Sequence, residues 1–256
     1  MKPSAKKIRL CVLFFLFLML GACAGSSPWK KEQAEVFINK GISYIELRQY
    51  PFALKEFREA QKYSPRDHRI YYYKGMVYHG MDMKQEAMES FKEAISLKAD
   101  YSEAHNYLGT LYMADKLWDK AIEHFDKAVA NPLYPTPAVA LYNAGLAYYS
   151  KKDYTKALES NRRALQREPQ TVLRPQIEKN IGLVFFEQSD FLNAIYHLQQ
   201  SVELNPNLFD AYFYLGEAYF KIGNKAKAQK AFQSVVELAP KSDLGKKASL
   251  YLQALK

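Results

Sequence analysis

The 256-residue chain has few of the residues that support covalent cross-links or metal sites. It contains five histidines and two cysteines, and because Cys11 lies in the N-terminal leader described below, only Cys23 would remain in the mature chain. No two histidines stand at the i, i+4 spacing of a helical metal site, and a lone histidine on a helix is usually structural. Segments with the alternating pattern of β-strands are nearly absent. We therefore expect an all-α protein without an intramolecular disulfide, a bound metal or a cofactor.

Recognisable catalytic motifs are also missing. No serine or cysteine stands in a nucleophile motif, and no glycine-rich phosphate loop is present. The many carboxylates usually neighbour basic residues, as in Lys55-Glu56, Lys92-Glu93 and Asp126-Lys127. Turnover that depends on one of the histidines stays open as an alternative, but the sequence favours a protein that is not an enzyme.

The excess of positive charge is small. The chain has 36 basic and 27 acidic residues, and four of the basic residues precede position 10. Nucleic-acid binding would require basic residues gathered on one face with stacking aromatic rings. Here lysine and arginine are scattered along the chain, which predicts a solvated outer surface and no nucleic-acid partner.

The N-terminus has the pattern of an export signal. Lys2, Lys6, Lys7 and Arg9 precede an apolar run over residues 10–20, which is too short to span a bilayer as a helix. We expect a signal peptide over residues 1–22. Residues 23–33, which begin with a small and polar run, are expected to form a flexible linker.

What the sequence has instead is an internal repeat. Glycines recur at spacings of 34, 34, 36, 37 and 34 residues, an aromatic ring follows each glycine by three residues, and an alanine follows it by twelve. The glycines are Gly41, Gly75, Gly109, Gly145, Gly182 and Gly216. We expect the glycine and the alanine to be small because two antiparallel helices cross there.

This unit resembles the tetratricopeptide (TPR) repeat. The resemblance implies a right-handed superhelix, an α-solenoid of six helix-turn-helix repeats over 34–67, 68–101, 102–137, 138–174, 175–208 and 209–242. An amphipathic helix over 243–256 is expected to cap the stack. Asn161 and Glu178 replace large apolar or aromatic residues of the pattern, so we expect the least regular packing in repeats four and five.

A proline-rich connector, residues 131–137, separates the third repeat from the fourth. Its three prolines cannot continue a helix. Leu133 and Tyr134, followed by Pro135, are apolar residues on a stiff arm, and we expect this arm to fold back onto the solenoid rather than to be a plain surface loop.

Six TPR repeats, this connector and the sequence Leu20-Gly21-Ala22-Cys23 together resemble the PilW/PilF/Tgl family of type IV pilus pilotins. The resemblance implies cleavage before Cys23, acylation of that cysteine, and an outer-membrane lipoprotein that binds secretin subunits and promotes their assembly. Ala24 after the cysteine implies the outer membrane of a diderm bacterium. We expect a monomer. A general periplasmic TPR adaptor, for example for cell-wall hydrolases, is the alternative.

In a TPR superhelix, fixed positions of the first helix of each repeat line the groove. Here they form a tyrosine-rich apolar set with asparagines, suited to an extended strand or an amphipathic helix. Some of these rings are expected to pack between repeats instead. Lys179 and Asn180 have the chemistry to hold a carboxylate, but the paired pattern does not recur, so we do not predict that mode. The predicted partner-binding residues are Ile38, Asn39, Ile42, Tyr72, Tyr73, Met76, Asn106, Tyr107, Thr110, Tyr142, Asn143, Leu146 and Tyr149.

Overall fold

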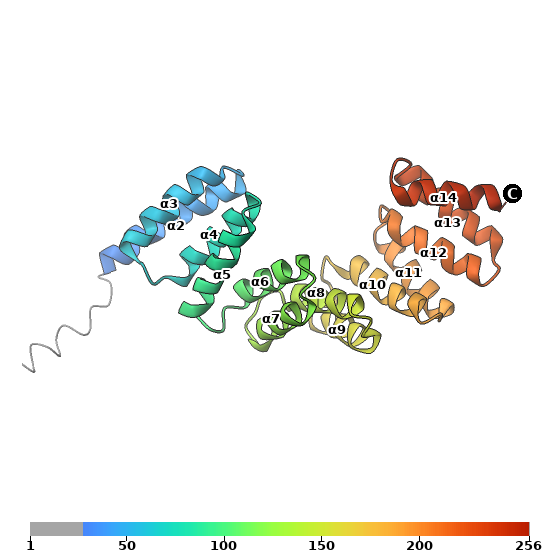
Figure 1. Ribbon diagram of the computed structural model, residues 1–256, viewed down its shortest axis with the longest axis horizontal. Coiled ribbons are helices and arrows are strands. Elements are labelled where there is room, and N and C mark those ends of the chain that lie inside the picture. The colour runs from blue at the N-terminus through green and yellow to red at the C-terminus, as the bar shows by residue number, and fades with distance from the viewer. Residues whose placement is uncertain (1–27, 256) are drawn as a thin grey trace, which may run out of the picture. The chain divides into compact units, whose positions relative to one another are not determined.

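The computed structural model describes residues 28–255. The predicted signal peptide and Cys23 lie outside these residues. Within them the chain forms thirteen α-helices and no strand (Figure 1). Twelve of these helices form six consecutive pairs, and the last helix packs on the sixth pair. The prediction of an all-α, TPR-like arrangement of paired helices is confirmed.

The helices are short and joined by tight turns. Nowhere between residues 28 and 255 does a helix combine the length and apolar character needed to cross a bilayer. Their bounds are α2 (Pro28–Glu46), α3 (Tyr50–Tyr63), α4 (His68–Gly80), α5 (Lys84–Leu97), α6 (Ser102–Ala114), α7 (Trp118–Ala130), α8 (Pro137–Ser150), α9 (Tyr154–Arg167), α10 (Arg174–Glu187), α11 (Phe191–Leu204), α12 (Phe209–Lys221), α13 (Lys225–Leu238) and α14 (Asp243–Ala254).

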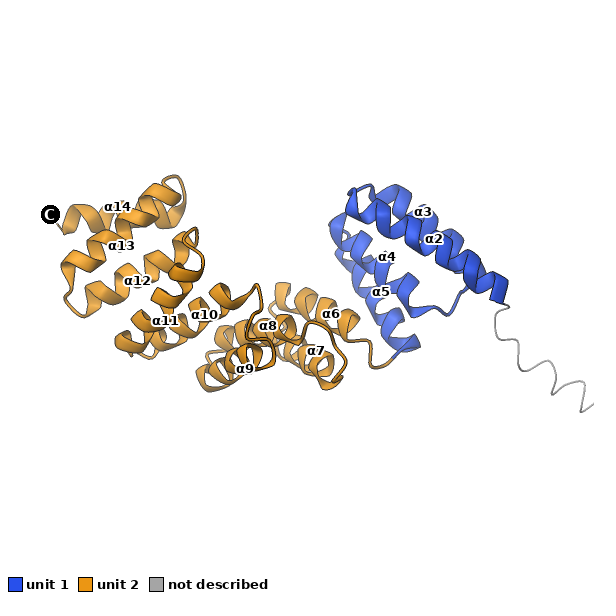
Figure 2. Cartoon of the chain, turned by 180° about the vertical axis from the view of Figure 1, so that it is seen from behind, with its two compact units in different colours: residues 1–98 blue, residues 99–256 orange. Residues whose placement is uncertain are grey.

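The helix pairs are divided between two compact units (Figure 2). Unit 1 contains α2 to α5 and ends at Lys98, and unit 2 contains α6 to α14 and begins at Ala99. In each unit neighbouring helix pairs stack through apolar clusters. The residues predicted to bind a partner therefore fall into two groups, one on each unit, which are described separately.

The first helix is longer than predicted. We assigned residues 28–33 to a flexible linker, but α2 begins at Pro28. Proline suits the first position of a helix because its φ is already near the helical value and its missing N–H is not needed there. The Trp29 ring packs edge-on against Tyr63 of α3, with 5.7 Å between the ring centroids. This contact packs the first turn of α2 against the second helix of the same repeat.

Each repeat glycine faces one residue on the second helix of its own pair. A Cβ atom at Gly109 would lie 2.6 Å from the Phe125 ring, and one at Gly41 would lie 2.4 Å from Phe57. The facing residue always stands sixteen positions later, and it is phenylalanine in four of the six repeats. The four phenylalanines are fully buried. The close crossing predicted from the repeat pattern is therefore confirmed, and the facing side chain is its physical cause.

Repeats four and five lack the facing phenylalanine and contain buried polar contacts, although Gly182 of repeat five faces the apolar Leu198. Asn161, which faces Gly145, is fully buried. It donates from Nδ2 to the Ala157 carbonyl at 2.7 Å and accepts from Asn180 Nδ2 at 3.3 Å. Glu178 is 6% exposed and lies 2.8 Å from His197 Nδ1. Asn161 thus finds partners on α9 and α10, and Glu178 finds one on α11, which keeps their burial from being prohibitively costly.

In the connector between α7 and α8, one of the two apolar residues predicted to fold back, Tyr134, is buried, and the other, Leu133, is exposed. Tyr134 is 6% exposed and belongs to the core of unit 2, so the prediction is confirmed for this residue. Leu133 is 87% exposed, so the prediction is wrong for it. The Asn131 side chain accepts a hydrogen bond from the Leu133 N–H and thereby fixes the turn that points the two side chains apart.

Tyr134→Ala is expected to destabilise unit 2 by about 3 kcal/mol, because removing a buried aromatic ring leaves a cavity. Leu133→Ala, the matched control, is expected to change the free energy of unfolding by less than about 0.5 kcal/mol. Urea unfolding followed by circular dichroism measures both changes. Equal effects of the two substitutions would show that the connector does not pack as described.

A histidine pair joins the two helices of the third repeat, with His105 buried and His124 half-buried. His105 is 3% exposed, and its Nδ1 lies 2.8 Å from Nδ1 of His124 on the second helix. His105 Nε2 lies 3.0 Å from the Ala99 carbonyl, which can only accept, so Nε2 carries the proton. His105 Nδ1 then accepts from the Nδ1–H of His124. Protonating His105 would make its Nδ1 a donor and would require the His124 proton to move to Nε2.

Stability is therefore expected to fall as the pH drops through about 6.5, the ordinary value for histidine. Burial lowers the pKa of His105; the Lys127 charge adds to this, while the Ala99 hydrogen bond and the Glu123 charge oppose it. Tyr112 stacks on His124 from the same helix pair. Because the unfolded chain binds the proton more tightly, the stability present above pH 6.5 is lost below it. Urea unfolding at a series of pH values tests this. His105→Gln should flatten the slope, and parallel curves for the two proteins would contradict the assignment.

Candidate functional site

The predicted residues of unit 1 lie mostly in its packing. Ile38 is 1% exposed and forms part of the core, so its prediction as a binding residue is wrong. Tyr73 stacks on the buried Phe57 ring with 5.6 Å between centroids. Asn39 is exposed, whereas Ile42, Tyr72 and Met76 are half-buried. Ile42 also packs against the core. Few of the partner-binding residues predicted in unit 1 are therefore accessible to a partner.

The predicted residues of unit 2 lie on α6 and α8, the first helices of repeats three and four. Asn106, Tyr107 and Thr110 on α6 are half-buried, as are Tyr142, Asn143, Leu146 and Tyr149 on α8. Asn143 Nδ2 donates to Asn106 Oδ1 at 3.1 Å and so joins the two helices. The Thr110 hydroxyl donates to the Tyr107 carbonyl within its own helix. These two helices bring all seven predicted residues onto neighbouring elements.

The same surface continues over α10, α12 and α14, where the sequence predicts no partner-binding residue. Hydrogen bonds join each first helix to the next. Tyr149 donates to Glu187 at 3.3 Å, Lys179 donates to Asp210 at 2.6 Å, and Tyr251 donates to Glu217 at 2.9 Å. We call this surface the first-helix face of unit 2. It comprises Asn106, Tyr107, Tyr142, Asn143, Leu146, Tyr149, Lys179, Phe186, Glu187, Asp210, Tyr214, Glu217 and Tyr251.

A sequence signal for the added residues existed. Relative to each repeat glycine, the positions that gave Tyr142 and Tyr149 on α8 give Lys179 and Phe186 on α10. On α12 the positions that gave Asn143 and Leu146 give Tyr214 and Glu217, and Asp210 stands six residues before Gly216. The irregular residues around position 178 and the longer fourth spacing obscured this register. Lys179 is engaged by Asp210, and Asn180 is 1% exposed, so these two residues do not form a carboxylate clamp.

The first-helix face is acidic as well as aromatic. It contains Glu187, Asp210 and Glu217 against one lysine. Burial raises the pKa of Tyr142, and the negative charge of Asp210 adds to this effect. Burial also raises the pKa of Tyr214, with contributions from the charges of Glu217, Asp210 and Glu187. The phenols therefore stay protonated and can donate hydrogen bonds in a field of negative sign.

The face ends in a pocket between α12 and α14. This pocket has a volume of about 570 Å³ and is lined by Phe213, Tyr214, Leu244, Leu250 and Tyr251, with Glu217 and Lys247 at its polar side. Leu250 is 65% exposed. An apolar hollow beside hydrogen-bonding groups suits one large side chain of a bound polypeptide. Among residues 28–255 no group of three or more histidine, cysteine or carboxylate side chains is placed to hold a metal ion.

Family models match most of the paired helices. A model described as "TPR repeat" matches residues 182–223. Models described as "Tetratricopeptide repeat" match residues 68–101, 100–170 and 210–242. This fold and this register define the class of protein. The chain is a TPR-repeat protein, a scaffold for binding other proteins.

Curated relatives share only part of their length with it. The human intraflagellar transport protein 88 homolog is 31% identical over 110 residues, which are 42% of this chain and 13% of that protein. The photosystem I assembly protein Ycf3 of Acaryochloris marina is 33% identical over 90 residues, 35% of this chain and 54% of that protein. The chain thus spans about half of one relative and a small part of the other.

Two solved structures match over nearly their whole chains. PilW, described as a widely conserved type IV pilus biogenesis factor, has a TM-score of 0.74 and 22% identity, covering 84% of this chain and 98% of PilW. PilF of Pseudomonas aeruginosa has a TM-score of 0.77 and 16% identity, covering 89% of this chain and 99% of PilF. At these identities the likeness establishes a common fold.

Proposed function

We propose that this protein is a lipid-anchored scaffold of type IV pilus biogenesis that binds a segment of a secretin subunit and promotes its localisation and multimerisation. The observation that supports binding most is the first-helix face of unit 2. The pilus assignment is supported by the resemblance of the connector and the Cys23 motif to pilotins and by a fold shared with PilW and PilF over most of this chain.

The residues of the first-helix face indicate which kind of polypeptide segment it would bind. Half-buried tyrosines offer apolar area at a low entropic cost, and their hydroxyls and the asparagine amides can bond a polypeptide backbone. Glu187 and Glu217, the two carboxylates of the face that no lysine among residues 28–255 engages, favour a segment that carries lysine or arginine. The pocket between α12 and α14 would receive one apolar anchor. We therefore propose that the bound segment combines basic residues with a large apolar side chain.

Deletion of the protein tests the assignment. The pilotin proposal expects secretin subunits to remain monomeric in the deletion strain and to form heat-resistant multimers again when the protein is restored. The alternative, a general periplasmic adaptor, expects normal secretin multimers in the same strain. Gel electrophoresis of unheated membrane fractions separates the two outcomes, and normal multimers would refute the pilotin proposal.

The proposal places the protein at the periplasmic face of the outer membrane through acylation of Cys23. Cys23→Ser is expected to release the protein from the membrane fraction, because two or more acyl chains are needed for stable anchoring and the variant would have none. The test compares membrane and soluble fractions by immunoblotting, with Cys11→Ser as the control. Continued membrane fractionation of the Cys23 variant with its helical circular dichroism intact would refute the tether.

A further inference from the structure

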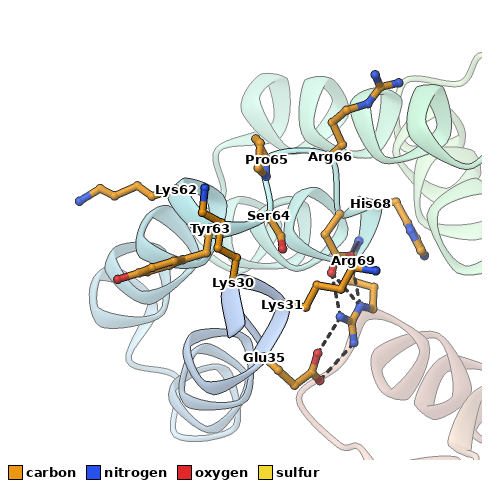
Figure 3. Close-up of a pocket in the computed structure, with 11 residues that line it drawn as sticks. Lys30, Lys31, Glu35, Lys62, Tyr63, Ser64, Pro65, Arg66, His68 and Arg69 are labelled. Atoms are coloured by element: carbon orange, nitrogen blue, oxygen red, sulfur yellow. Dashed lines mark hydrogen bonds and ion pairs between the residues drawn. The ribbon is translucent and has the colours of Figure 1, made fainter. Parts of the chain in front are cut away.

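A second pocket, which is lined mainly by polar and charged residues, lies at the N-terminal end of unit 1. It has a volume of about 780 Å³ and is formed by the start of α2, the end of α3 and the turn that leads into α4. Five cationic side chains line it, against two carboxylates (Figure 3). The cations are Lys30, Lys31, Lys62, Arg66 and Arg69. The sequence predicted scattered basic residues, but the fold gathers these from two segments more than thirty positions apart.

The two carboxylates of the pocket are already engaged. Arg69 lies 2.7 Å from Glu35 and 2.7 Å from Asp67, so one guanidinium serves both acids. Figure 3 shows these ion pairs on one side of the pocket, with Lys62 and Arg66 extending away from them. Among residues 28–255, neither Lys30, Lys31 nor Arg66 forms an ion pair. Three cations therefore remain for an external anion.

An exposed tryptophan stands beside these cations. Trp29 is 57% exposed although its edge contacts Tyr63, which also lines the pocket. Tryptophan next to lysine is typical of segments at a membrane–water interface, where the ring sits among the headgroups and the ammonium contacts phosphate. A pocket for a small soluble anion would not require an exposed indole ring against Tyr63, one of its lining residues.

The pocket lies close in the sequence to the predicted acylation site. The predicted acylation site, Cys23, precedes Pro28 by five residues, which span at most about 17 Å. An acyl anchor at Cys23 would therefore hold this end of unit 1 within reach of the bilayer surface. Combining a lipid anchor with basic residues is an established route to stable membrane attachment.

We propose that this end of unit 1 binds the phosphate groups of anionic phospholipids at the surface of the membrane that carries the anchor. Lys30, Lys31 and Arg66 contact the headgroups, and Trp29 lies at the interface. The contact would fix which end of the protein faces the bilayer. The inference rests on the proposed tether for its orientation, but it requires neither acylation nor a secretin, so its failure can be distinguished from that of the proposed function.

The test uses the unacylated chain from residue 24, which keeps every described residue. Vesicles of phosphatidylglycerol and phosphatidylcholine should bind this chain in a sedimentation assay at low salt, and vesicles of phosphatidylcholine alone should not. Each basic side chain near an anionic surface contributes about fivefold in affinity. Changing Lys30, Lys31 and Arg66 together to glutamate should therefore weaken binding more than about 100-fold. The matched control changes Lys225, Lys230 and Lys241, which are exposed on unit 2, to glutamate and should bind much more tightly than the pocket variant.

Trp29 provides a local readout. The chain has two tryptophans, so Trp118→Phe leaves Trp29 as the single reporter. Anionic vesicles should shift its fluorescence to shorter wavelength. Equal binding of the pocket and control variants would overturn the proposal, as would binding of inorganic phosphate without any binding of vesicles. Preference for an acidic peptide such as polyglutamate over vesicles would overturn it as well. Circular dichroism of each variant excludes loss of fold as the cause.

Discussion

Gly109→Ala is expected to destabilise unit 2 by about 2 kcal/mol. The new methyl group would lie 2.6 Å from the Phe125 ring, which is fully buried and cannot move without disturbing its neighbours. Overpacking of this kind costs about 3 kcal/mol, and the better helix propensity of alanine offsets about 1 kcal/mol of it. For a unit of this size the midpoint of thermal unfolding should fall by about 4–8 °C.

A double-mutant cycle separates this cause from a general effect on the helix. Phe125→Ala alone should cost about 4 kcal/mol because it leaves a cavity. In the Gly109→Ala background it should cost at least about 1 kcal/mol less, because the clash disappears and the added methyl group fills part of the space. Strictly additive effects would show that Gly109 is not small on account of the ring.

Changing Tyr142, Leu146 and Tyr214 together to alanine is expected to weaken partner binding about 100-fold. The three residues lie on α8 and α12 within the first-helix face and are half-buried there, so each supplies apolar area that a bound segment can cover. Interface hot spots contribute about 2 kcal/mol or more each and are not additive, so the loss from three of them is at least about 3 kcal/mol.

The control for that experiment lies on the second helix of repeat four. Glu159, Arg162 and Gln166 are exposed on α9, and changing all three to alanine should leave binding within about twofold of the unmodified protein. Binding is measured by titrating immobilised secretin with each variant, and thermal unfolding of each variant accounts for any loss of folded protein. Equal affinities of the two triple variants would place the binding surface elsewhere.

The arrangement of the helix pairs could be predicted because it repeats. One glycine, one alanine and one facing side chain per repeat recur at a period near 34 residues, and the close approach of Gly109 to Phe125 explains why this pattern persists. Such contacts are local within a helix pair, so their spacing in the sequence is fixed by the geometry of the two helices and the turn.

The buried polar pairs could not be predicted in the same way. His105 pairs with His124, and Glu178 pairs with His197 at the equivalent positions of another repeat, nineteen residues apart in both cases. Only two of the six described repeats carry such a pair, and its first residue differs between them, so single residues such as Glu178 look like faults in the pattern. Only the positions of both helices show that one polar residue compensates the other.

The candidate site could be predicted only in part, because the repeat register does not show which side chains the neighbouring helices cover. The register of the first helices gave Tyr142, Asn143, Leu146 and Tyr149 on α8, which the structure places beside α6 and α10. The same register gave Ile38, which is buried in the core. A repeat position specifies the direction of a side chain from its helix, but the neighbouring helices decide whether that side chain is covered.

Photocrosslinking in cells tests whether the first-helix face of unit 2 receives a segment of another protein. A benzophenone amino acid is placed at position 146 or 214 on the face, and at position 162 on α9 as the control. We expect a crosslink to the secretin subunit from positions 146 and 214 and none from position 162. Crosslinking to the secretin from position 162 with none from the other two would contradict this expectation.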